Sequence, residues 1–92
     1  MSKYIAWDQE KDKWLKKERN MGFEDIFAAI EQGGLIKIRD HPNVERYVNQ
    51  KEFIVLIEKY VYIVPFVEDE EKIFLKTAYP SRKETKKYYE KN

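Results

Sequence analysis

The sequence predicts an α+β fold in which two helices precede an antiparallel meander and a short basic helix follows it. Two kinds of hydrophobic spacing support this order. Residues 23–30 carry apolar side chains at the spacing of one helix face, whereas residues 35–79 alternate or form apolar runs of strand length. Helices placed before and after a continuous series of strands are typical of α+β domains.

A short strand and a polar helix are expected at the start of the chain. Residues 4–7 are apolar and aromatic, which favours a strand. Residues 9–20 are strongly helix-forming, with Trp14 and Leu15 as the main apolar contacts. Asp8 precedes this helix at the position where an N-cap side chain accepts a hydrogen bond from the first turn.

The second helix has the clearest pattern. Its apolar stripe is formed by Phe23, Ile26, Phe27 and Ile30. Because these positions share one helical face, we expect that face to be buried, with Phe27 at the centre of the core. The glycine pair at 33–34 provides a left-handed stop for the helix.

Four strands are expected in the second half of the chain. They cover residues 35–39, 53–57, 60–67 and 72–79. A tight link at 58–59 joins the second of these strands to the third, and Pro65, which cannot donate to a ladder, predicts a bulge or an unpaired edge. Pro80 ends the last strand, and Ser81 is the expected N-cap of the final basic helix.

Length and composition exclude several classes of function. Ninety-two residues suit one domain, which we take to span residues 1–92. The chain has no cysteine, which excludes disulfides, thiol nucleophiles and thiolate metal sites, and its single histidine argues against a histidine-based metal centre. We therefore expect no metal and no cofactor. No apolar run approaches the roughly 18 residues of a membrane span, and no signal-like segment is present, so we expect a cytoplasmic protein without membrane contact.

The net charge of +1 conceals an uneven distribution. Residues 11–19 and residues 81–92 each hold five basic and two acidic side chains, whereas residues 68–71 are all acidic. A polyanion responds to local potential, so the basic segments are compatible with nucleic-acid binding. The acidic run lacks the glycine-centred spacing of a calcium loop and is expected to be a solvated turn.

Three segments, taken in order, resemble the BrnT family of bacterial toxins. They are residues 7–11, residues 22–25 and the tail at 81–90. Arg82 and Thr85 match an arginine and a threonine of the family pattern, and Lys76 approximates the basic residue that ends the family's last strand. The resemblance implies a RelE-like fold and a ribonuclease that forms the toxin half of a type II toxin–antitoxin pair. It also implies an RNA substrate and a cognate DNA-binding antitoxin, with which the toxin would form a hetero-oligomer.

Metal-independent RNA cleavage defines the chemistry that the site residues would perform. The neighbouring 2′-hydroxyl attacks the phosphorus, so the enzyme must remove a proton, stabilise the added charge and protonate the leaving 5′-oxygen. Arg82 is the expected stabiliser, because a guanidinium pairs with two phosphate oxygens. Lys76 or His41 would handle a proton, or Lys76 would clamp the phosphate. Tyr79 is the fourth catalytic candidate.

The tail is also the expected RNA-binding element. Lys83, Lys86 and Lys87 would contact the RNA backbone, and Tyr88 would stack on a base. Since Tyr88 and Tyr89 are consecutive and cannot share a helix face, one of the two is expected to pack in the core. The alternative is a non-enzymatic binding module whose basic tail contacts nucleic acid or an acidic protein. The two readings differ in whether Arg82 and Lys76 converge on one concavity beside an aromatic side chain.

Overall fold

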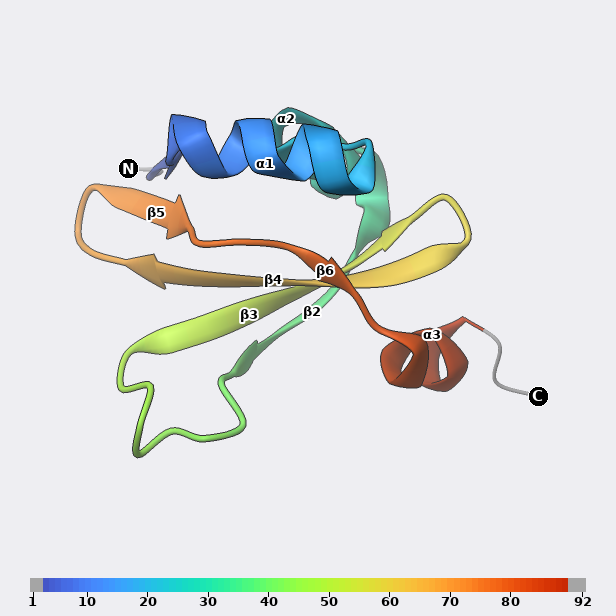
Figure 1. Ribbon diagram of the computed structural model, residues 1–92. Coiled ribbons are helices and arrows are strands. Elements are labelled where there is room, and N and C mark those ends of the chain that lie inside the picture. Colours follow the sequence, from blue (N-terminus) through green and yellow to red (C-terminus); the bar gives the residue numbers. More distant parts are fainter. Residues whose placement is uncertain (1–2, 90–92) are drawn as a thin grey trace.

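The computed structural model describes residues 3–89 and has the predicted α+β architecture. In chain order its elements are β1 (Tyr4–Trp7), α1 (Gln9–Arg19), α2 (Phe23–Ala29), a π-helical turn η1 (Ile30–Gly34), β2 (Leu35–Asp40), β3 (Gln50–Ile57), β4 (Tyr60–Glu68), β5 (Lys72–Leu75), β6 (Tyr79–Pro80) and α3 (Arg82–Tyr88). Figure 1 shows α1 and α2 on one side of the sheet and α3 on the opposite side. We call this second side the α3 face.

The sheet joins a meander to a strand from the start of the chain. Its order is β1-β5-β4-β3-β2, and the pairs from β2 to β5 are antiparallel as predicted. β1 adds to β5 in parallel, with Tyr4 opposite Lys72, so the complete sheet is mixed. Hydrophobic alternation indicates that a segment is a strand but not which partner it takes, and this pairing was not predicted.

Side-chain caps begin α1 and α3 at the predicted residues. Asp8 Oδ2 accepts a hydrogen bond from Lys11 N at 3.1 Å, and Ser81 Oγ accepts one from Glu84 N at 3.1 Å. The start of α2 is capped from a distance, because the buried carboxylate of Asp12 on α1 accepts a hydrogen bond from Phe23 N at 2.8 Å. Gly33, with φ 97°, supplies the predicted left-handed stop.

The prediction of one strand over residues 72–79 is wrong, and Pro65 on the neighbouring strand explains the break. Pro65 lies within β4, buried and opposite Glu52 of β3. Its carbonyl accepts a hydrogen bond from Lys76 N at 2.8 Å, but its nitrogen has no hydrogen to return. The ladder beside β4 therefore stops after Leu75 and resumes as the two-residue β6.

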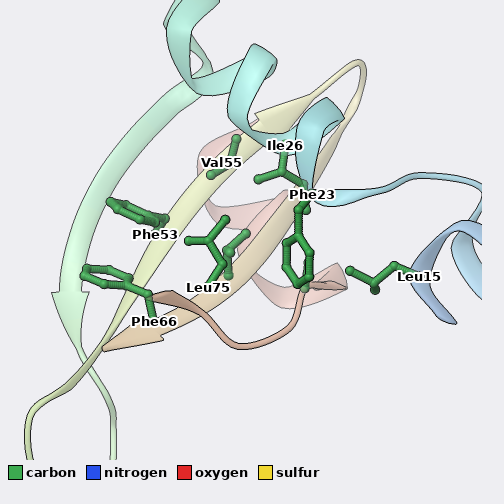
Figure 2. Close-up of a cluster of buried hydrophobic side chains, with 9 residues drawn as sticks. Leu15, Phe23, Ile26, Phe53, Val55, Phe66 and Leu75 are labelled. Atoms are coloured by element: carbon green, nitrogen blue, oxygen red, sulfur yellow. The ribbon is translucent and has the colours of Figure 1, made fainter. Parts of the chain in front are cut away.

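The main core lies between the sheet and the first two helices, as Figure 2 shows. Phe53 and Phe66 stack there with ring centroids 4.0 Å apart, and Phe23 stacks on Trp7 at 5.6 Å. Phe27 was expected at the centre of this core, and that prediction is wrong because its side chain is only partly buried.

The rotation of α2 explains the position of Phe27. Ile26 is fully buried and Ala29 packs against the core, so the helix turns the side that carries these two residues towards the sheet. Phe27 lies about 100° around the helix from Ile26. It is consequently at the edge of the buried stripe.

The acidic residues 68–71 are exposed at one end of the sheet. Glu68 is the last residue of β4, and residues 69–71 form the β4–β5 connection, in the expected turn. Asp69 Oδ1 accepts hydrogen bonds from the backbone N–H groups of Glu71 and Lys72. These two hydrogen bonds lower the pKa of Asp69 below its ordinary value.

None of the helices formed by residues 3–89 combines the length and the apolarity that a bilayer span needs.

Candidate functional site

Strand register places a row of polar side chains across the α3 face. Arg39 on β2 is opposite Glu52 on β3, and Glu52 is opposite Pro65 on β4. Lys76 continues the row, since its backbone N–H donates to the Pro65 carbonyl. Residues directly opposite one another in antiparallel strands point to the same side of a sheet. Arg39, Glu52 and Lys76 therefore share the α3 face.

Tyr79 lies beside this row. It pairs with Ile63, whose buried side chain belongs to the cluster beneath α3, and its own side chain is 36% exposed. Partial burial raises the pKa of Tyr79, and the nearby charge of Glu52 raises it further, whereas Arg39 lowers it. The net effect keeps the phenol protonated to higher pH than in a solvated tyrosine. Tyr79 thus presents a proton donor on the same face as Lys76.

At the β2 end of the row, Arg39 is held between two buried carboxylates. Its Nε donates to Glu52 Oε1 at 2.9 Å, and its Nη1 donates to Glu84 Oε2 on α3 at 3.0 Å. Glu52 is 1% exposed and Glu84 is 4% exposed. Burial alone would lower the pKa of Arg39, but the hydrogen bonds and charges of both glutamates raise it above its ordinary value. The guanidinium is therefore permanently charged and already paired.

Helix α3 is attached to the sheet by its inner side, which leaves its first residue at the surface. Thr85 Oγ1 accepts a hydrogen bond from Val61 N at 2.9 Å, and Ser81 N donates to the Val61 carbonyl at 2.9 Å. Glu84 and Thr85 are buried, whereas Arg82 is exposed. Arg82 consequently begins a helix that lies on the same face as Lys76 and Tyr79.

The predicted RNA-binding residues of the tail divide between surface and core. Lys83, Lys86 and Lys87 are exposed. Tyr88 is partly buried against the small cluster beneath α3, with Lys87 Nζ 5.2 Å from its ring centroid. The expectation that one of the two tyrosines packs inward is met by Tyr88. This packing argues against the base-stacking role predicted for Tyr88 and leaves Tyr89, which is 44% exposed, as the tyrosine available for stacking.

His41 lies in the connection between β2 and β3. Its Nδ1 accepts a hydrogen bond from Asn43 N at 3.0 Å, and its ring lies 4.1 Å from the ring of Tyr47. Its backbone N–H donates to the Gln50 carbonyl, which extends the β2–β3 ladder by one position. These contacts give His41 a structural role in the turn and make Lys76 the stronger candidate for proton transfer.

The candidate site residues Arg82, Lys76 and Tyr79 are exposed and lie outside the three cavities described next. Three surface cavities of about 470, 240 and 210 Å³ lie beside α2 and the β3–β4 hairpin, under the β2–β3 connection, and at the end of α1. None of these three is lined by Arg82, Lys76 or Tyr79. The concavity that would favour the enzyme is therefore not among them. Within residues 3–89, no group of three or more histidine, aspartate or glutamate side chains is arranged to hold a metal ion.

Sequence reasoning did not identify Arg39, Glu52 or Glu84 as members of the site. The sequence did contain a signal for Arg39, because it is an arginine at an alternating position of a predicted strand. The carboxylates that pair with it come from β3 and α3, which only the folded chain brings together.

Comparison with known proteins gives no further indication of function. No family model, no curated protein and no solved structure matches this chain. Support for a function therefore comes from the residues of the α3 face and from the resemblance of the three sequence segments.

Proposed function

We propose that the protein is a BrnT-like toxin with a RelE-like fold that cleaves RNA by metal-independent transesterification in the cytoplasm. The observation that carries the proposal is that Lys76, Tyr79 and the start of α3 belong to one face of the molecule. Lys76 and Tyr79 lie on that face of the sheet, and the helix that begins with Arg82 covers part of it. The resemblance of residues 7–11, 22–25 and 81–90 to the BrnT pattern points to the same chemistry.

In the proposed reaction, the RNA phosphate binds beside the first turn of α3. The 2′-oxygen attacks the phosphorus and its proton passes to Lys76, which accepts it in the neutral amine form. The bond from phosphorus to the 5′-oxygen then breaks, which leaves a 2′,3′-cyclic phosphate on one product. Tyr79 donates a proton to the departing 5′-oxygen, and Arg82 stabilises the charge on the phosphate oxygens. Arginine suits this last task because its planar fork matches two phosphate oxygens at once.

Replacing Arg82 with alanine tests the proposed reaction. The cleavage rate is expected to fall by about 10²–10³, the usual effect of removing one group that stabilises transition-state charge. RNA affinity should change much less, because such a group acts mainly in the transition state. The assay follows cleavage of a single-stranded RNA in EDTA and identifies the 3′ ends of the products.

Arg46→Ala is the matched control, because Arg46 is likewise an exposed arginine and belongs to the β2–β3 connection. The control should retain most of the activity, and circular dichroism should show both variants folded. Full cleavage by Arg82→Ala, or no cleavage of any RNA by the wild-type protein, would contradict the proposal.

The lysines of α3 give a second prediction, which concerns binding and not catalysis. Changing Lys83, Lys86 and Lys87 together to glutamine should flatten the dependence of log affinity on log salt by roughly two units, at about 0.7 per single-strand phosphate contact. Each of these side chains is exposed and free to meet a phosphate. Affinity is measured by fluorescence anisotropy between low and physiological salt. An unchanged slope would show that these lysines are ordinary solvated charges.

The proposed partner of the toxin is a DNA-binding antitoxin that forms a hetero-oligomer with it and covers the basic surface of α3. The exposure of Lys83, Lys86 and Lys87 supports this role, because an acidic surface of a partner would have several cations within reach.

A non-enzymatic module that binds nucleic acid or an acidic protein is the second candidate. The open character of the α3 face favours it, since enzyme sites are usually concave. The two candidates separate in the cleavage assay, where a binding module would retain RNA affinity and yield no cyclic phosphate.

A further inference from the structure

We infer that Arg39 is a positioning residue, which holds the first turn of α3, and with it Arg82, against the sheet. The role assigned to Arg82 rests on the proposed function. The anchoring of α3 rests on contacts within the protein and can be tested without any activity.

Arg39 connects three elements through one side chain. It belongs to β2, at the edge of the sheet, and its guanidinium donates to Glu52 on β3 and to Glu84 on α3. Two carboxylates face this single cation, so the cluster carries a net negative charge when both are ionised. A phosphate would be repelled by that charge, which argues against Arg39 as a second RNA contact and in favour of an internal role.

Helix α3 depends on such contacts because it is short. It has seven residues, and isolated helices below about 12–15 residues are marginal in water. Ser81, just before the helix, donates its N–H to the Val61 carbonyl, and the other attachments, at Thr85 and Tyr88, lie further along the helix than Glu84. Glu84 is the third residue of α3 and is two positions from Arg82. Ser81 fixes where the chain enters the helix, and the contact with Arg39 holds the Glu84 side of the first turn against the sheet.

The environment of Glu84 makes this contact difficult to replace. Its Oε1 atom is buried and has no hydrogen-bond partner among the described residues, while Oε2 is bound by Arg39. Arg39 is thus the cation that compensates a carboxylate that is 4% exposed. Without that compensation a buried charge is strongly disfavoured, and Glu84 would gain by moving into water. Such a movement would loosen the first turn of α3 and change where Arg82 lies relative to the sheet.

A double-mutant cycle between Arg39 and Arg82 tests the positioning role. Arg39→Lys keeps the charge but loses the planar fork that reaches both carboxylates. We expect it to lower the single-turnover cleavage rate by about 10²-fold, the scale of a misplaced catalytic group, with RNA affinity little changed. In an Arg82→Ala background the same substitution should have almost no further effect, because there is no longer an arginine at position 82 to position.

Glu84→Gln provides an independent variant, since it keeps the shape of the side chain and removes the buried charge that Arg39 pairs. It should reproduce the loss of rate and the non-additivity, and it serves in place of Arg39→Lys if that variant fails to fold. Arg46→Lys is the matched control, because Arg46 is an exposed arginine of the β2–β3 connection. It should leave the rate unchanged.

Amide hydrogen exchange gives the readout that does not require activity. In Arg39→Lys and Glu84→Gln, protection of the α3 amides should fall while the amides of β3 and β4 stay protected. Unchanged α3 protection would overturn the inference, and so would full multiplicative effects of the Arg39 and Arg82 substitutions. If the wild-type protein cleaves no RNA, the proposed function fails, and the exchange measurement alone decides whether Arg39 anchors the helix.

Discussion

Arg39→Ala should destabilise the protein by about 3–5 kcal/mol, the usual cost of removing one partner from a buried ion pair. The cost arises because Glu52 and Glu84 would remain almost wholly buried without a cation. About a third or more of the stability of a small domain would be lost if that stability lies near 5–10 kcal/mol. Chemical denaturation of the wild type and the variant measures the difference.

The control for this prediction removes the whole cluster instead of one member. Replacing Arg39 with methionine and both glutamates with leucine should be roughly neutral or stabilising by about 1–4 kcal/mol, since no uncompensated charge is then left inside. A loss below about 1 kcal/mol for Arg39→Ala alone would show that water or a neighbouring side chain compensates the two carboxylates.

Phe23→Ala should also cost about 3–5 kcal/mol, as expected when a buried phenylalanine is truncated and leaves a cavity. Phe23 is fully buried between α2 and the sheet, and its ring stacks on Trp7. Phe27→Ala is the matched control, because it removes the same ring from the same helix at a partly exposed position. Its cost should be less than half as large. Equal costs in chemical denaturation would mean that α2 is not rotated as described.

Features decided by neighbouring residues were predictable from the sequence. Asp8 and Ser81 were recognised as caps because each accepts a hydrogen bond from a residue three positions along the chain. The left-handed stop at Gly33 and the tight link between β3 and β4 are equally local. At the candidate site, the placement of Tyr79 and Arg82 at the junction of the last strand and the last helix follows from the same short-range signals.

Features that depend on contacts between distant segments were not predictable. The rotation of α2 that exposes part of Phe27 is decided by the sheet beneath it, and the break after Leu75 is decided by Pro65 on another strand. The grouping of Arg39 with Glu84 joins β2 to α3. Hydrophobic periodicity contains no information about such pairs. The sequence therefore predicts the helices and strands of the site better than it predicts the ion cluster of Arg39, Glu52 and Glu84.

The parallel pairing of β1 with β5 has a consequence for how the chain acquires its structure. β1 is made first, but its partner is among the last strands to be synthesised. At roughly 5–20 residues per second, the chain needs several seconds to extend from β1 to β5. Until β5 is made, β1 has no strand partner, and the apolar sides of α1 and α2 lack part of the sheet that covers them. Pairing between strands so far apart in the chain also slows folding after the chain has left the ribosome. The α3 face is therefore complete only when the last strand and helix have emerged from the ribosome, and the proposed activity would arise only then.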